Sequence, residues 1–158
     1  MEWKDVIDNP VLAELPFKIQ LNEWGKIEMS PASNLHGMLQ TAIAFKLKLL
    51  CDGGKAFVEC SIETTKNVKV ADVVWASSSF YSRNGNETPF KEAPEIVVEV
   101  ASPSNTIEEL MNKKELYFQK GAKEVWLCAE DGSMSFYSVT GKITQSLQCP
   151  SFPKTVEA

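Results

Sequence analysis

Two carboxylates of this 158-residue chain stand inside apolar segments that are typical of buried strands. Asp72 lies in VADVVW (residues 70–75), and Glu99 lies in PEIVVEV (residues 94–100). A buried charge is costly unless a cation or a metal ion offsets it. Two such side chains could hold a divalent cation through their oxygens, because magnesium needs only one or two protein carboxylates and keeps several waters. The alternative is that each carboxylate simply faces solvent from its strand.

A divalent cation held in this way could activate water and stabilise charge during phosphodiester hydrolysis. The sequence separation of Asp72 and Glu99 does not establish that the two side chains meet. The chemistry therefore depends on the elements that would bring them together.

The region around Glu99 predicts a strand, a helix and a second strand, over residues 95–100, 107–120 and 124–129. Thr106 is a suitable N-cap for this helix, and Gly121 is a normal C-terminal stop. This order of elements is the βαβ signature of an α/β domain.

The rest of the chain predicts two hairpins, one long helix and two further strands. The long helix begins near Ser33 and stops before Gly53, and its apolar residues recur at helical spacing, so we expect that face to pack on a sheet. Residues 77–91 are rich in Ser, Asn and Gly, which predicts an irregular, mobile surface loop. The predicted hairpins span 17–29 and 133–143, the strands span 56–64 and 69–76, and the helical stripe comprises Leu35, Met38, Leu39, Ala42, Phe45 and Leu49.

Five segments carry a resemblance that runs through nearly the whole chain. They are NEWGKIEMSPASNLHG (22–37), VADVVW (70–75), PEIVVEVASPSNT (94–106), KKELY (113–117) and GAKEVWL (121–127). In this order they resemble the Uma2 family, a branch of the PD-(D/E)XK nuclease-like superfamily. The resemblance implies one domain over residues 1–158, with a restriction-endonuclease-like α/β core. That core would be a mixed, curved sheet flanked by helices, with an N-terminal β-hairpin.

The same resemblance implies an endonuclease that acts on DNA and depends on magnesium or manganese. Asp72 and Glu99 would be its metal ligands. In the superfamily a lysine usually follows the glutamate by two positions on the same strand, but that position is Ala101 in this chain. The strict form of the motif is therefore absent.

Uma2-like proteins place the lysine on the following helix, four residues before a tyrosine, and KKELY puts Lys113 in that relation to Tyr117. Residues four apart share one face of a helix, so both can point toward the strand ends. Lys113 would then orient water or stabilise the developing charge on a phosphate. Lys114 is the competing candidate, since it falls in register with the apolar side of the helix.

Three further residues are candidate auxiliary members of the site. His36, the only histidine, belongs to the SNLHG part of the resemblance and could relay a proton or bind phosphate, although it could equally be a capping or packing residue. Glu95 lies four positions before Glu99, and we expect it on the same face of the strand as an additional ligand. Tyr117 completes the set.

Composition narrows the class of protein. A net charge of −5 argues against a protein that coats nucleic acid, because such proteins bind the phosphate backbone largely through Lys and Arg. An acidic average does not exclude a nuclease, whose site carboxylates contribute negative charge. No apolar run reaches the roughly 20 residues of a spanning helix, so we expect a soluble, cytoplasmic protein without a membrane partner. The four cysteines lack paired spacing, which predicts buried free thiols.

The residues and the family resemblance together predict a metal-dependent endonuclease, with DNA as the substrate that the resemblance implies. The competing hypothesis is a nuclease fold that no longer cleaves and that binds nucleic acid or protein. The sequence leaves open the choice between DNA and RNA, the sequence specificity, the biological target, and whether the chain forms a homodimer.

Overall fold

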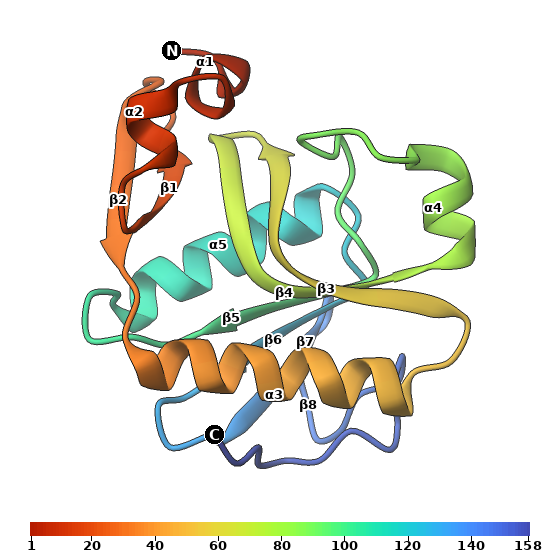
Figure 1. Ribbon diagram of the computed structural model, residues 1–158. Helices are drawn as coiled ribbons and strands as arrows, with labels where there is room; N and C mark the ends of the chain where they lie inside the picture. The colour runs from red at the N-terminus through yellow and green to blue at the C-terminus, as the bar shows by residue number, and fades with distance from the viewer.

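The computed structural model describes all residues 1–158 as an α/β fold built on a six-stranded mixed sheet (Figure 1). Only β5 and β6 run parallel, and every other neighbouring pair is antiparallel. The strand order is β3-β4-β5-β6-β7-β8, with bounds Gly54–Thr64, Asn67–Ser77, Ile96–Val100, Glu124–Cys128, Met134–Ser138 and Gly141–Ile143. The predicted mixed sheet is thus confirmed.

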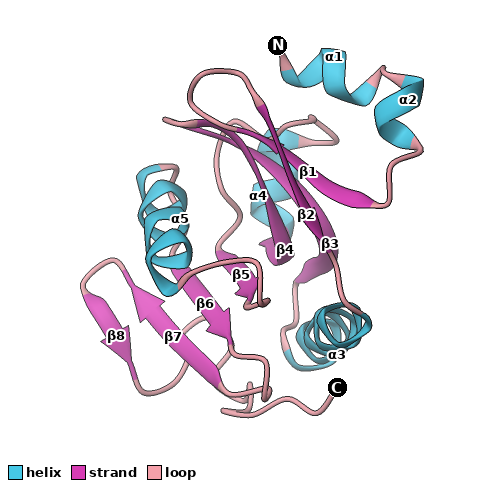
Figure 2. Ribbon diagram, turned by 90° about the vertical axis from the view of Figure 1, so that its left-hand side faces the viewer, coloured by secondary structure: helices cyan, strands magenta, loops and turns pink.

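A separate antiparallel hairpin, β1 (Phe17–Leu21) and β2 (Ile27–Pro31), lies beside β4 (Figure 2). Lys69 of β4 joins the two units, because its Nζ donates to the carbonyl of Leu21 at 3.1 Å and contacts Glu28 Oε2 at 3.2 Å. The N-terminal hairpin is therefore confirmed, and it reaches the same strand that carries Asp72.

Two helices cover opposite faces of the sheet. Helix α3 (Asn34–Leu50) packs on one face, and α5 (Ile107–Gln119) packs on the other, as Figure 2 shows. Alternate side chains of β5 serve the two layers, since Ile96, Val98 and Val100 belong to the α3-side core whereas Val97 belongs to the α5-side core. The capping box of Thr106 and Glu109 fixes the start of α5 close to the end of β5.

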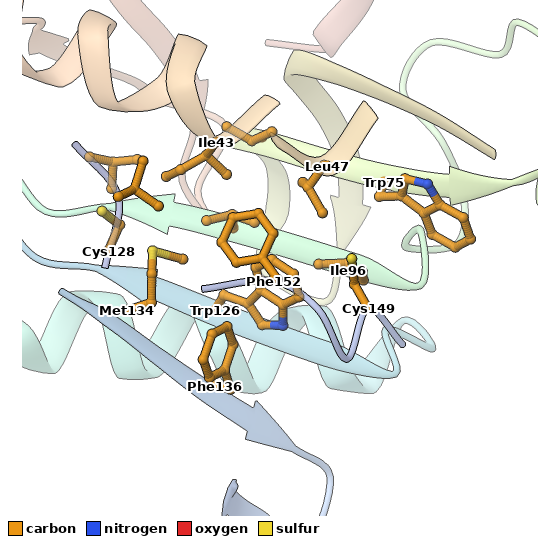
Figure 3. Close-up of a cluster of buried hydrophobic side chains, with 14 of the residues drawn as sticks. Ile43, Leu47, Trp75, Ile96, Trp126, Cys128, Met134, Phe136, Cys149 and Phe152 are labelled. Atoms are coloured by element: carbon orange, nitrogen blue, oxygen red, sulfur yellow. The ribbon is translucent and has the colours of Figure 1, made fainter. Parts of the chain in front are cut away.

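The α3-side core is closed by the C-terminal segment (Figure 3). The ring of Phe152 lies 4.6 Å from that of Trp126, and Phe136 meets the same Trp126 edge to face at 5.0 Å. The buried carboxylate of Glu124 fixes the start of this segment, because it accepts hydrogen bonds from the backbone N–H groups of Leu147 and Gln148 at 2.6 and 2.9 Å. Through Cys149, Phe152 and Val156, the C-terminal segment is therefore part of the domain core.

Two predictions about elements were wrong. Residues 77–91 contain a helix, α4 (Ser78–Asn84), which begins at the Ser77 cap and is anchored by the buried Phe80. In α3, the residues facing the core are His36, Leu39, Ile43 and Leu47, and most of the expected stripe is exposed. Two short N-terminal helices, α1 (Trp3–Ile7) and α2 (Pro10–Ala13), were not predicted. None of the helices has the length and apolar character required to cross a membrane.

Candidate functional site

Asp72 and Glu99 come from neighbouring strands at the point where those strands separate. The antiparallel pairing of β4 and β5 ends at Val73 and Val98, so the next residues in the register are Asp72 and Glu99. The N–H of Val100 donates to Asp72 Oδ2 at 2.7 Å instead of to a backbone carbonyl of β4. Both carboxylates are almost completely buried, and both line one small cleft.

Asp72 is surrounded by groups that favour its ionised form. Its Oδ1 accepts from Lys18 Nζ on β1 and lies 3.2 Å from His36 Nε2 on α3. Burial acts to raise the pKa of Asp72, but the charge of Lys18, the hydrogen bond from His36 and the charge of Lys113 outweigh it and hold this pKa well below its usual value. Asp72 is therefore a carboxylate over the whole physiological pH range.

The two bases beside Asp72 respond to it in turn. Burial lowers the pKa of Lys18, yet the negative charges of Asp72 and Glu99 more than compensate, so that Lys18 remains an ammonium. The hydrogen bond with Asp72 raises the pKa of His36. Because the Asp72 carboxylate can only accept, His36 Nε2 carries the proton of their hydrogen bond, and His36 Nδ1 is buried without a hydrogen-bond partner.

Glu99 is held from the other side of the sheet by α5. Lys113 Nζ donates to Glu99 Oε2 at 2.9 Å, and Tyr117 Oη donates to Oε1 at 2.6 Å. The two donors are one helical turn apart and therefore share a face. Burial, followed by the charge of Glu99, raises the pKa of Tyr117 well above its usual value, which keeps its hydroxyl protonated as a donor.

The cleft is small and strongly polar. Its volume is about 40 Å³, which suits a few waters or a partly hydrated ion. Two carboxylates face two ammonium groups across it. No group of three or more His, Cys, Asp or Glu side chains is arranged to hold a metal, so the available ligand set is the oxygens of Asp72 and Glu99. That set fits magnesium, provided that the ammonium of Lys18 moves away from Asp72 Oδ1.

The structure brings together five of the six residues that the sequence singled out. Asp72, Glu99, Lys113 and His36 line the cleft, and Tyr117 lies behind Glu99 and donates a hydrogen bond to it. Their catalytic and metal-binding roles remain predictions.

Glu95 does not belong to this group. Four residues along an extended strand span about 13 Å, so the shared face does not bring Glu95 to the same end of the strand as Glu99. Its carboxylate instead accepts from the backbone N–H of Ser77 at 3.0 Å and from the Ser77 hydroxyl. The structure therefore does not bring the expected additional ligand Glu95 to the cleft.

Lys114 lies outside the cleft, pairing with Glu115 at 2.7 Å and lying over the ring of Tyr137. Of the two neighbouring lysines, only Lys113 therefore reaches the cleft.

Lys18 is the residue that the sequence did not single out. It stands in a short strand between Phe17 and Ile19, where alternation alone predicts an ordinary solvent-facing lysine. Only the position of the hairpin next to β4 brings it to Asp72, 54 residues away in the chain. No local pattern marks this contact.

Comparisons with known proteins agree with this architecture. The model of the Uma2 family, described as "Putative restriction endonuclease", matches residues 17–157. Among solved structures, the chain is similar to a crystal structure described as a putative nuclease belonging to DUF820 from Anabaena variabilis ATCC 29413. The TM-score is 0.61 at 17% identity, over 84% of this chain and 72% of that chain, a likeness that concerns the fold. No curated protein matches the sequence. Because the family model covers the hairpin, both helices that contribute to the cleft and the whole sheet, the chain belongs to the Uma2 family.

Proposed function

We propose that the protein is a metal-dependent endonuclease that hydrolyses phosphodiester bonds in DNA. The observation that carries this proposal is the cleft in which Asp72 and Glu99, from adjacent strands, lie with Lys113. Two carboxylates that could share a cation, next to an ammonium group, are what hydrolysis of a phosphodiester needs. The family description and the nuclease-like fold support the same reaction class.

Asp72 and Glu99 would hold a magnesium or manganese ion. When bound, such an ion supplies Lewis-acid stabilisation and a more acidic water. The N–H of Val100 and the hydroxyl of Tyr117 already fix one oxygen of each carboxylate. The other oxygen of each could take the cation once Lys18 and Lys113 move away from it. The hydrogen bond from Tyr117 keeps Glu99 in this orientation.

Lys113 and His36 have different tasks in this proposal. Lys113 is the cation that can leave Glu99 Oε2 and contact a non-bridging phosphate oxygen, where negative charge develops during attack by water. His36 positions Asp72 through Nε2. As the oxygen of water bonds to phosphorus it releases a proton to solvent, and as the P–O bond to the leaving group breaks the departing oxygen takes up a proton from solvent.

Substitution of single side chains tests the proposal. We expect the wild type to nick supercoiled plasmid with magnesium or manganese but not with EDTA. Asp72→Asn and Glu99→Gln should each lower the rate about 100-fold or more, and Lys113→Ala should do the same by removing charge stabilisation at the transition state. Lys114→Ala is the matched control, one residue away on the same helix, and should stay within about threefold of the wild type.

The readouts are cleavage rates on plasmid, single-stranded DNA and RNA at one metal concentration, together with calorimetric titration of manganese into each variant. Lys113→Ala should retain manganese binding, whereas Asp72→Asn and Glu99→Gln should lose it. Cleavage that survives EDTA, or that falls equally in Lys113→Ala and Lys114→Ala, would contradict these assignments.

A second candidate function rests on one specific feature. All four carboxylate oxygens of Asp72 and Glu99 already accept a hydrogen bond, two of them from lysines, so the site neutralises itself without a metal. This arrangement favours a fold that binds nucleic acid or protein without cleaving. Absence of cleavage on every substrate, combined with absence of manganese binding by the wild type, would support this function and reject the first.

A further inference from the structure

Helix α3 presents an apolar stripe to solvent on the side away from its core-facing residues. We call Leu35, Met38, Ala42, Phe45 and Leu49 the outer stripe of α3. Ala42, at its centre, is half-buried and also contacts the α3-side core. Leu35, Met38, Phe45 and Leu49 are 41%, 55%, 64% and 66% exposed. The helix runs along the outside of the molecule (Figure 1), and no segment of the chain covers these four side chains. A contiguous exposed stripe of this kind marks an interaction surface.

The spacing of the outer stripe identifies the shape of the partner. Its residues follow one another at intervals of three, four, three and four, which is the spacing of the apolar seam in a pair of coiled helices. A partner helix should therefore lie nearly parallel or antiparallel to α3. A broad, flat partner would not match a seam of this width.

The outer stripe is complementary to itself. Leu35 and Leu49 each lie seven residues from Ala42, and Met38 and Phe45 lie four and three residues from it. In an antiparallel pair of α3 helices, Ala42 meets Ala42 on the two-fold axis, Leu35 faces Leu49, and Met38 faces Phe45. The smallest side chain thus lies where the two backbones approach most closely, as a two-fold interface requires.

The charges on α3 favour an antiparallel over a parallel arrangement of the two helices. Lys46 and Lys48 flank the outer stripe in the C-terminal half of α3, whereas residues 34–45 contain no Lys, Arg, Asp or Glu. A parallel pair would place the lysines of one copy beside those of the other, which is destabilising. An antiparallel pair places them beside the uncharged half of the partner helix.

The surface continues beyond the helix. A groove between α3 and the C-terminal segment is lined by Ala42, Phe45, Lys46, Pro153 and Thr155. One helix seam is small compared with the roughly 1,200 Å² or more that a specific interface buries in total, and this groove adds contact area. His36 points the other way, toward Asp72, so the pairing leaves the cleft open.

We propose that a second copy of this chain binds the outer stripe, forming a two-fold homodimer through antiparallel α3 helices with Ala42 on the axis. This inference is independent of the proposed nuclease activity, since it uses no residue of the cleft.

Sedimentation velocity from about 1 to about 100 μM tests whether the dimer forms. The wild type should shift from monomer to dimer over this range. Phe45→Glu, which would bury a charge in the seam, should weaken the dimer about 100-fold or more and leave a monomer throughout. Val139→Glu is the control, because Val139 is 72% exposed in the turn between β7 and β8. A monomeric wild type, or a dimer unaffected by Phe45→Glu, overturns the proposal.

Phe45 is exposed, so the variant should keep the wild-type melting temperature measured at monomer concentrations. If Phe45→Glu nevertheless unfolds, Leu49→Lys replaces it, with the same expected loss of the dimer.

Cysteine cross-linking tests the direction of the helices. All four native cysteines are buried, so an introduced surface cysteine is the reactive one. Under mild oxidation, Ala42→Cys should form a covalent dimer. Leu35→Cys should not, because the two Leu35 positions of an antiparallel pair are roughly 21 Å apart along the helix, beyond the reach of a disulfide. Equal cross-linking of both variants overturns the antiparallel arrangement.

Discussion

Asp72 is held by donors from three separate parts of the chain. Lys18 on β1 and His36 on α3 both contact Oδ1, and the N–H of Val100 on β5 binds Oδ2. The two oxygens are therefore unequal: one is fixed by a neutral backbone donor, and the other faces a full positive charge. A divalent cation at this carboxylate would compete with Lys18.

We predict that Lys18→Met increases the affinity of the site for manganese by about tenfold, because it removes a competing and repelling ammonium. The same change should lower the melting temperature of the metal-free protein, since Asp72 loses the counter-charge that offsets its burial. Calorimetric titration and thermal unfolding measure the two effects.

Lys69→Met is the matched control for this experiment. Lys69 also joins the hairpin to β4 and is also buried, but it pairs with Glu28 and does not line the cleft. It should lower stability without increasing manganese affinity. Unchanged or weaker binding by Lys18→Met would show that Lys18 does not compete with the ion.

For single residues, a role in the site could be predicted only where the residue differed in polarity from its neighbours in the sequence. Asp72 and Glu99 could be predicted because a charge inside an apolar strand needs an explanation. Lys18 could not, because a lysine in a five-residue strand is ordinary until the hairpin docks beside β4. The resemblance correctly preferred Lys113 to Lys114 as the residue that faces Glu99.

Among the elements, the junction of β4, α4 and β5 depends on Glu95. Its carboxylate binds both the N–H and the hydroxyl of Ser77, and that hydroxyl in turn caps α4 by accepting from the N–H of Phe80. One side chain thus ties the end of β4 to the start of α4 from the neighbouring strand.

Glu95→Ala should therefore lower the free energy of unfolding by about 1–3 kcal/mol, because it leaves the Ser77 donors without their acceptor. Manganese affinity should not change, since Glu95 lies at the far end of β5 from Glu99. Urea unfolding and calorimetry provide the two measurements. The control is Glu92→Gln in the exposed pair with Arg83, which should cost less than about 1 kcal/mol. Loss of metal binding in a fully stable Glu95→Ala protein would restore Glu95 to the site.

The elements differed in how well local pattern predicted them. The strand, helix and strand around Glu99 were predicted within a residue or two, because apolar runs, a cap and a terminal glycine all agreed. Helix α4 was missed because its Ser- and Asn-rich sequence resembles a loop, and its stability depends on tertiary contacts, namely the burial of Phe80 and the hydrogen bonds of Glu95 to the Ser77 cap. Helix α3 has two apolar stripes of equivalent periodicity, so only packing on the sheet shows which one faces the core.

For the molecule as a whole, the reactivities of the four cysteine thiols can be used to monitor the two faces of the sheet separately. Cys51, Cys128 and Cys149 belong to the α3-side core, whereas Cys60 belongs to the α5-side core. Burial raises the pKa of Cys128 to about 11 and raises those of the other three as well. At neutral pH the native protein should thus react very slowly with alkylating reagents.

We predict that Glu124→Gln accelerates alkylation of Cys51 and Cys149 by about tenfold or more while leaving Cys60 unchanged. The Ser146 hydroxyl and the Leu147 N–H donate to the two oxygens of Glu124, and a glutamine offers an N–H group in place of one of these acceptors. Loss of that hydrogen bond would loosen the C-terminal segment locally. Peptide mass spectrometry after timed alkylation gives each rate, with Cys60 as the internal control. Equal acceleration at Cys60 would indicate global unfolding instead.

The closing of the α3-side core by Phe152 and Val156 also sets an order of events on the ribosome. The members of the α5-side core lie between Cys60 and Val125, whereas the α3-side core extends from Leu39 to Val156. At ordinary rates of translation, the 31 residues that separate Val125 from Val156 take about 2 to 6 s to synthesise. During that interval the nascent chain can bury the α5-side face of its sheet, while Trp126 and Phe136 on the other face are not yet covered by Phe152. The growing chain therefore passes through a stage at which chaperones have an apolar surface to bind, and that stage ends only when Phe152 and Val156 leave the exit tunnel.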